Sequence, residues 1–206
     1  TSSGLRSLRD KTLTYFDEAM SEQEPSDRLF KIVNTLAAQV RRVAQEDKDA
    51  LAESGLYFNI HALIGGQCRN DPAHRLYLVY PQGNWVEVEQ GTPYHIIGAS
   101  GYGKPILDRT LKHQDSMRFA LKVGCLAFDS TRISAADVDF PIDIVLYSRG
   151  SFRCVERRYA KDDLLEMSSW WQDRLRRSVA ELPSDVIDSM CADLPLATNM
   201  NGTFPA

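Results

Sequence analysis

The chain has 206 residues, of which 43% are apolar and 25% are charged, and this composition is typical of one globular domain with a substantial core. Its net charge of −4, with basic and acidic residues interspersed, excludes the concentrated positive face of a nucleic-acid-binding protein. No apolar run reaches the length of a membrane span, so we expect no membrane partner.

Two helices are predicted before any strand. Apolar residues at helical spacing cover residues 5–20, and Pro25-Ser26-Asp27 then supplies a stop followed by a cap. A longer helix begins near Leu29 and is expected to end near Gly55, a candidate C′ glycine. This order indicates a helical layer that covers a sheet.

The middle of the chain changes to β patterning. Runs rich in β-branched, aromatic and Leu residues, separated by turn residues, predict four strands. These strands are expected at residues 56–64, 75–80, 85–89 and 95–97, with a turn at residues 81–84.

The second half alternates between helices and a hairpin. Pro105 suits the first turn of a helix, because the nitrogen at that position needs no hydrogen-bond partner. The further elements are expected to be a helix over residues 115–128, hairpin strands over 142–147 and 152–159, and an amphipathic helix over 162–182. Separate runs of helices and strands indicate a layered α+β fold.

The tail mixes turn-forming and polar residues with scattered Leu and Met. We expect it to form an extended arm or to contact a neighbouring subunit. The predicted organisation is therefore a domain of residues 1–182 and a tail of residues 183–206.

Neither cysteines nor histidines form a metal-binding pattern. The histidines lack ligand spacing, so we expect no metal, and no other cofactor is indicated. The cysteines are widely spaced without a C-x-x-C pair, which favours reduced thiols and a cytoplasmic protein. The cysteines are Cys68, Cys125, Cys154 and Cys191.

A glycine-rich segment over residues 98–104 fits the pattern G-x-x-x-x-G-K between a predicted strand and a helix. Pro105 follows, however, at the position where a phosphate-binding loop needs Ser or Thr to hold Mg²⁺. The proline also removes one amide from the helix N-terminus. We therefore interpret the segment as a tight turn that brings two elements close together, and keep nucleotide binding as a minor alternative.

The threonine at position 1 suggests an N-terminal nucleophile, because a free amine can accept the proton of its own hydroxyl. Such a threonine begins a strand of the sheet. Thr1 instead leads through Ser2-Ser3-Gly4 into a predicted helix, and we reject it as the nucleophile.

Several segments resemble proteasome β-type subunits, in the order in which that family has them. They are residues 3–5 ahead of a helix, 60–66 and 97–106. The most specific run, Tyr102-Gly-Lys-Pro-Ile-Leu-Asp-Arg109, is similar to the bacterial branch called Anbu, as are Phe128-Asp-Ser-Thr131 and Pro141-Ile-Asp143. The resemblance covers the chain to about Leu182.

The resemblance implies a four-layer αββα sandwich of the N-terminal nucleophile hydrolase type, with two antiparallel sheets between helical layers. It implies a self-compartmentalising threonine-type endopeptidase that acts on peptides or unfolded proteins as a homo-oligomeric ring or helical assembly. Thr1 matches a position downstream of the family's nucleophile. We therefore expect this sequence to be N-terminally incomplete, without the first strands, the nucleophile and its lysine, and to be inactive as written.

The same resemblance assigns roles to five residues. Gly4 matches the glycine whose amide forms the oxyanion hole. Asp129 matches the acidic residue that supports the threonine amine, and either Ser130 or Ser134 would assist it. Arg6 falls where the family lines its specificity pocket, which suggests acidic or polar substrate residues.

Two alternatives to a peptidase subunit stay open. One is a non-catalytic assembly or gating subunit of a proteasome-like ring. The other, from a different class, is a nucleotide-binding protein that uses residues 98–104.

Overall fold

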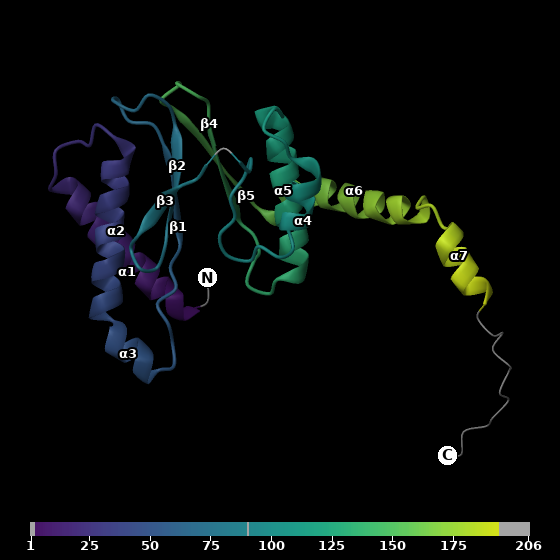
Figure 1. Ribbon diagram of the computed structural model, residues 1–206, viewed down its shortest axis with the longest axis horizontal. Helices are drawn as coiled ribbons and strands as arrows, with labels where there is room; N and C mark the ends of the chain where they lie inside the picture. Colours follow the sequence, from purple (N-terminus) through teal and green to yellow (C-terminus); the bar gives the residue numbers. More distant parts are fainter. Residues whose placement is uncertain (1–2, 90, 194–206) are drawn as a thin grey trace, which may run out of the picture. The chain divides into compact units, whose positions relative to one another are not determined.

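The computed structural model describes residues 3–89 and 91–193 (Figure 1). The chain divides into two compact units, Thr1–Leu165 and Glu166–Ala206. The first unit contains both sheets and the helices that pack on them. The second contains most of α6 (Lys161–Ala180) and all of α7 (Asp185–Ala192). A domain boundary after residue 182 stays a prediction.

The first unit is layered. Figure 1 shows α1 (Ser3–Ser21) and α2 (Leu29–Glu46) on one side, followed by a three-stranded sheet and then a two-stranded sheet. A second pair of helices, α4 (Lys104–Thr110) and α5 (Met117–Ser134), lies on the other side. Two antiparallel sheets therefore lie between helical layers, which confirms the predicted α+β architecture.

The core of this unit forms between α2 and the middle strand of the larger sheet. Buried apolar side chains recur every three or four residues along α2 and pack against Tyr77 and Val79. Burial of one Val or Leu side chain stabilises a fold by about 1.5–3 kcal/mol, so this face fixes the helix on the sheet. The buried residues of α2 are Leu29, Val33, Leu36, Ala37, Val40 and Val43.

The predicted second helix is broken in two. α2 ends at Glu46, and α3 (Lys48–Glu53) begins after Asp47, whose carboxylate accepts a hydrogen bond of 2.9 Å from Lys11 of α1. Gly55, with φ +65°, ends α3 as predicted. The amide of Leu56 donates to the carbonyl of Leu51, as in a Schellman cap.

Lys11 also joins α1 to the end of α2. Its ammonium lies 2.9 Å from a carboxylate oxygen of Glu46, and the Nε atom of Arg42 lies 2.9 Å from the other oxygen. Hydrogen bonds from Lys11 and Arg42 lower the pKa of Glu46 to about 2. This ion-pair group fixes the first helix beside the second.

The larger sheet is shorter than predicted. β1 (Ala62–Gly66), β2 (Arg75–Val79) and β3 (Trp85–Glu87) pair antiparallel in that order. The predicted strand over residues 56–64 is wrong in its first part. Ala62 pairs with Val79, the last residue of β2, and residues 56–61 pair with no residue of that strand. The predicted strand at residues 95–97 is also wrong, since this segment joins neither sheet.

The glycine-rich turn packs α4 onto α5. A Cβ on Gly103 would lie 2.8 Å from the carbonyl oxygen of Ala127, so only glycine permits this approach. Pro105 lies in the first turn of α4, as predicted. α5 is capped by Ser116 and extends to Ser134, beyond the predicted end at residue 128, so Asp129 lies within the helix.

The predicted hairpin is confirmed as β4 (Ile142–Tyr147) and β5 (Cys154–Tyr159). Arg158 pairs with both carboxylate oxygens of Asp143 across the two strands, at 2.7 and 2.8 Å. The hydroxyl of Tyr147 donates a 2.9 Å hydrogen bond to Gln67, which follows β1. This contact connects the two sheets.

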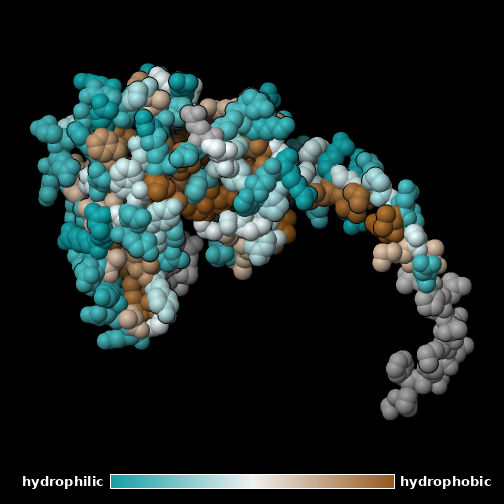
Figure 2. All heavy atoms as spheres, in the orientation of Figure 1, coloured by the Kyte–Doolittle hydropathy of each residue, from teal (hydrophilic) through white to brown (hydrophobic). Residues whose placement is uncertain are grey.

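The second unit departs from the predicted extended arm, because residues 185–192 form α7. Large apolar side chains on α6 and α7 are exposed, and Figure 2 shows them gathered along these helices. Among the described residues, no helix is long and apolar enough to span a membrane. The four cysteines are free thiols.

Candidate active site

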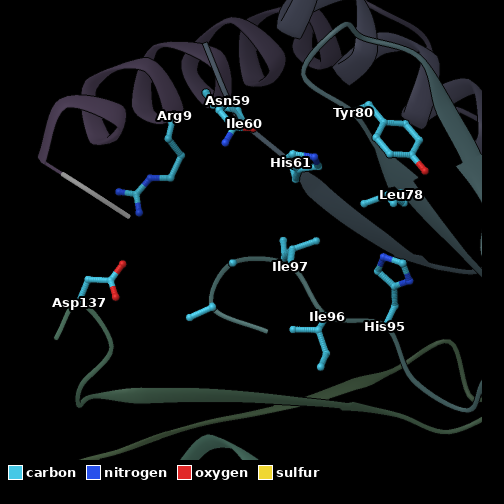
Figure 3. A pocket seen from close by; sticks show the side chains of 12 residues that line it. Arg9, Asn59, Ile60, His61, Leu78, Tyr80, His95, Ile96, Ile97 and Asp137 are labelled. Atoms are coloured by element: carbon cyan, nitrogen blue, oxygen red, sulfur yellow. The ribbon is translucent and has the colours of Figure 1, made fainter. Parts of the chain in front are cut away.

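A cavity of about 880 Å³ opens in the first unit (Figure 3). Its wall includes Arg9 of α1, the chain that leads into β1, the end of β2 and the chain that precedes the glycine-rich turn. The lining residues are Arg9, Asn59, Ile60, His61, Leu78, Tyr80, His95, Ile96, Ile97, Gly98, Ala99 and Asp137.

Two opposing walls of this cavity are extended backbone that belongs to neither sheet. Figure 3 shows residues 59–61 on one side and residues 95–97 on the other. Backbone amides and carbonyls in such segments can pair with a further extended polypeptide, as in β-augmentation.

The polar side chains gather at the two ends of the cavity. Arg9 and Asp137 lie toward one end, and His61, Tyr80 and His95 lie toward the other (Figure 3). The rings of His61 and Tyr80 meet edge to face, with centroids 6.1 Å apart. The guanidinium of Arg9 is held by Asp10 at 2.7 and 2.9 Å.

A smaller cavity of about 270 Å³ shares the segment around Ile96, Ile97 and Ala99 with the larger one. Its other lining residues come mainly from α4 and α5 and are mostly apolar. Ala127, Phe128 and Thr131 of α5 belong to this wall. The segment at residues 96–99 thus borders both cavities.

Asp129 lies on α5, beside the residues that line the smaller cavity. Its side chain is only 7% exposed, and Arg132, with a side chain 19% exposed, pairs with it at 2.9 Å. A buried carboxylate is costly unless a cation or hydrogen-bond donors compensate it, so this pair explains how Asp129 is accommodated. Asp129 does not line the larger cavity.

The chain shows clear likeness to solved structures. No family model and no curated protein matches it. Anbu (ancestral β-subunit) from Yersinia bercovieri is 29% identical over 86% of this chain and 76% of its own, with a TM-score of 0.77. The helical assembly of the Anbu complex from Pseudomonas aeruginosa contains a chain that is 27% identical over the same shares, with a TM-score of 0.79. A Gly-1 mutant of Anbu from Hyphomicrobium sp. strain MC1 is 29% identical over the same shares, with a TM-score of 0.75.

These matches support an Anbu-type, proteasome-like branch for the chain. This finding confirms the resemblance carried by the glycine-rich turn and the α5 segment. The fold is accordingly that of the matched Anbu structures over most of the described chain.

The predicted site residues of this Anbu-type chain lie on two helices. Gly4 is the second residue of α1, where only its backbone is described, and Arg6 is exposed in the same turn. Asp129, Ser130 and Ser134 all lie on α5. Thr1 lies outside the described residues.

Helix geometry does not bring either serine to Asp129. Ser130 and Ser134 are one and five positions away, and such residues point to other sides of a helix. Arg132, three positions away, is on the same face and makes the contact. Sequence reasoning missed Arg132, although the spacing Asp-x-x-Arg within a helix was the available signal. It also gave no role to His61 and His95 on the cavity wall.

The lysine of the glycine-rich turn is engaged in this Anbu-type chain. The ammonium of Lys104 lies 2.6 Å from Asp108 and 3.1 Å from the hydroxyl of Tyr94, and Tyr94 also bonds Asp108. These contacts raise the pKa of Lys104 and lower the pKa of Asp108. The helix that follows has only seven residues. The arrangement therefore disfavours nucleotide binding.

We expect calorimetric titration with Mg-ATP to give no binding heat, because Lys104 is already paired with Asp108 on its own helix. Lys104→Ala should then behave as the wild type does, and exposed Lys112→Ala is the matched control. ATP binding that disappears in Lys104→Ala alone would contradict this expectation and restore the nucleotide hypothesis.

Proposed function

We propose that this chain is a subunit of a self-compartmentalising threonine-type endopeptidase that hydrolyses peptide bonds in peptides or unfolded proteins. The observation that carries the proposal is the likeness of 86% of the chain to solved Anbu structures, with TM-scores of 0.75 to 0.79. The cavity bounded by two extended segments supports it, because extended backbone is the form in which a peptide can pair with them.

In this proposal the oxyanion of the reaction lies at the start of α1. The first four amides of an α-helix have no acceptor within the helix, and the helix dipole favours negative charge at that end. Gly4 is the second residue of α1 and contributes such an amide. Arg6, exposed in the same turn, would favour acidic or polar substrate residues.

Asp129 supports the amine of the nucleophilic threonine, and family resemblance assigns that threonine and its lysine to the segment upstream of Thr1. The 206-residue chain by itself is then expected to be inactive. A hydroxyl from Ser130 or Ser134 could assist only if the end of α5 changed conformation, because neither faces Asp129 on the helix.

The active form is proposed to be a homo-oligomeric ring or helical assembly. One of the matched structures is described as a helical assembly, and the exposed apolar side chains of α6 and α7 form a surface that a second copy could cover. The four free cysteines support a cytoplasmic location.

A non-catalytic assembly or gating subunit is the second candidate. The observation that favours it is the position of Asp129, which is paired with Arg132 and does not line the larger cavity. An acid that supports catalysis must meet the reacting amine, and this requires the upstream segment to reach α5.

The deciding experiment is covalent labelling of the full-length protein with an electrophilic peptide, such as a peptide epoxyketone, followed by peptide mapping. We expect one adduct on a threonine upstream of residue 1, because that group combines a hydroxyl with its own amine. The 206-residue chain serves as the unlabelled control. No adduct, under conditions that label a proteasome, would overturn the peptidase and leave the assembly role.

A further inference from the structure

We propose that Arg132 is a positioning residue of the proposed peptidase, which holds the Asp129 carboxylate in the orientation that the threonine amine needs. The inference rests on the proposed function, in which Asp129 supports that amine. It concerns a residue to which the sequence resemblance assigned no role.

The contact itself is specific. A terminal guanidinium nitrogen of Arg132 donates to the Oδ1 atom of Asp129 at 2.9 Å, between positions three apart on α5. Both side chains are largely removed from water, with exposures of 19% and 7%. The surface pair of Asp143 and Arg158 has a similar distance of 2.7 Å, but its side chains are 58% and 69% exposed. Of these two pairs, the α5 pair is the one that holds a carboxylate in a mostly buried position.

The guanidinium is held from a second side. Its central carbon lies 5.2 Å from the ring centroid of Phe140, which is within the range of a cation–π contact. The Phe140 ring in turn meets Phe128 at a centroid distance of 6.3 Å. Arg132 thus lies between a carboxylate on its own helix and an aromatic ring that follows the helix, so its orientation is restricted.

An arginine in this position has a chemical consequence for Asp129. Guanidinium stays protonated at every pH at which a protein is folded, so it is a permanent partner for a carboxylate. A carboxylate can accept several hydrogen bonds, so the bond from Arg132 leaves Asp129 able to meet an amine as well. The arginine fixes the position of the carboxylate, and the carboxylate can then orient the nucleophile's amine.

Stability alone is a weak reason for this pair. Buried ion pairs can often be replaced by well-packed apolar residues without loss of stability, because their desolvation is costly. Asp129 and Arg132 lie about one helical turn apart, beside residues that line the smaller cavity. A need for the carboxylate itself explains such a buried pair better than stability does. The distinction can be measured in the rate of covalent labelling.

The test uses the assembled full-length protein and the peptide epoxyketone, and separates the maximal labelling rate from the probe concentration that gives half of it. Asp129→Asn and Arg132→Met are each expected to lower the maximal rate by about tenfold to a hundredfold, with little change in the half-saturating concentration. The double variant should be no slower than the slower single variant, because the two residues act as one unit. Arg132→Lys should recover part of the rate, and Arg158→Met, which breaks the exposed pair, should keep the wild-type rate.

The outcomes separate the two proposals. A wild type that is not labelled overturns the peptidase and the role of Arg132 together. A labelled wild type with an unchanged rate in Arg132→Met overturns the role of Arg132 alone. If Arg132→Met does not assemble, Arg132→Lys decides: a reduced maximal rate at unchanged half-saturation supports the inference, and a wild-type rate contradicts it.

Discussion

Gly83→Ala is expected to lower the free energy of unfolding by about 2–5 kcal/mol, from left-handed backbone strain together with steric overlap. Gly83 has φ +71° in the turn between β2 and β3. A Cβ there would overlap the Arg41 side chain and lie 2.7 Å from the carbonyl oxygen of Ala37, so the turn is pressed against α2. Thermal or urea unfolding monitored by circular dichroism measures the loss.

Alanine variants at two other glycines are controls that separate backbone strain from steric overlap. Gly55 also has a positive φ, +65°, but a Cβ there would meet nothing within 4 Å, so Gly55→Ala measures backbone strain alone. Gly124 lies in α5 with open space around it, so Gly124→Ala should be neutral or slightly stabilising. A loss in Gly83→Ala no larger than in Gly55→Ala would show that α2 moves away at little cost.

The double variant Val179→Asp, Val186→Asp is expected to abolish assembly of the full-length protein. Val179 on α6 is 73% exposed and Val186 on α7 is 77% exposed. They belong to a set of exposed apolar side chains on α6, on α7 and in the segment that joins them, and exposed apolar side chains gathered in this way mark a protein–protein surface. The set comprises Leu175, Val179, Leu182, Val186 and Met190. Burial of a charge at each position would oppose contact with a second copy.

Size-exclusion chromatography with light scattering measures the effect as a fall to the mass of one subunit. Ser169→Asp adds one such charge at an exposed polar position of α6 and should leave the assembly intact. Unchanged mass in the double variant would show that copies meet through other surfaces. The circular dichroism spectrum should stay that of the wild type, because neither valine is part of the core.

The elements that depend on local pattern were predictable from the sequence. The apolar face of α2, the Gly55 cap and the β4–β5 hairpin each follow from spacing within one segment, and the structure confirms them. The strand predicted over residues 95–97 failed because a strand exists only where a partner strand lies beside it, and no local pattern supplies that partner.

Two predicted helix boundaries were wrong for other reasons. The end of α5 was expected before Asp129, since the polar run Asp-Ser-Thr interrupts the apolar periodicity. The helix nevertheless continues to Ser134, and Thr131 and Asp129 are among its buried residues. At the break between α2 and α3, Asp47 is bonded by Lys11 from a different helix, a contact that no local pattern reports.

The candidate site was predictable only where the resemblance named a residue. It named Asp129, an assignment that stays a prediction, and the structure adds that Arg132 is paired with it. The cavity was beyond prediction, because its walls come from α1, the approach to β1 and the segment at residues 95–99. Sequence spacing does not report that such distant segments meet.

The hairpin described above also affects how this chain behaves when it is partly unfolded. β4 and β5 pair only with each other in the described part of the chain, so each presents an outer edge. β5 carries the exposed charges Glu156, Arg157 and Arg158, which act as gatekeepers against edge-to-edge aggregation. β4 has a single charge, Asp143, and Arg158 neutralises it. The edge of β4 is therefore the less protected of the two against pairing with a strand of another chain.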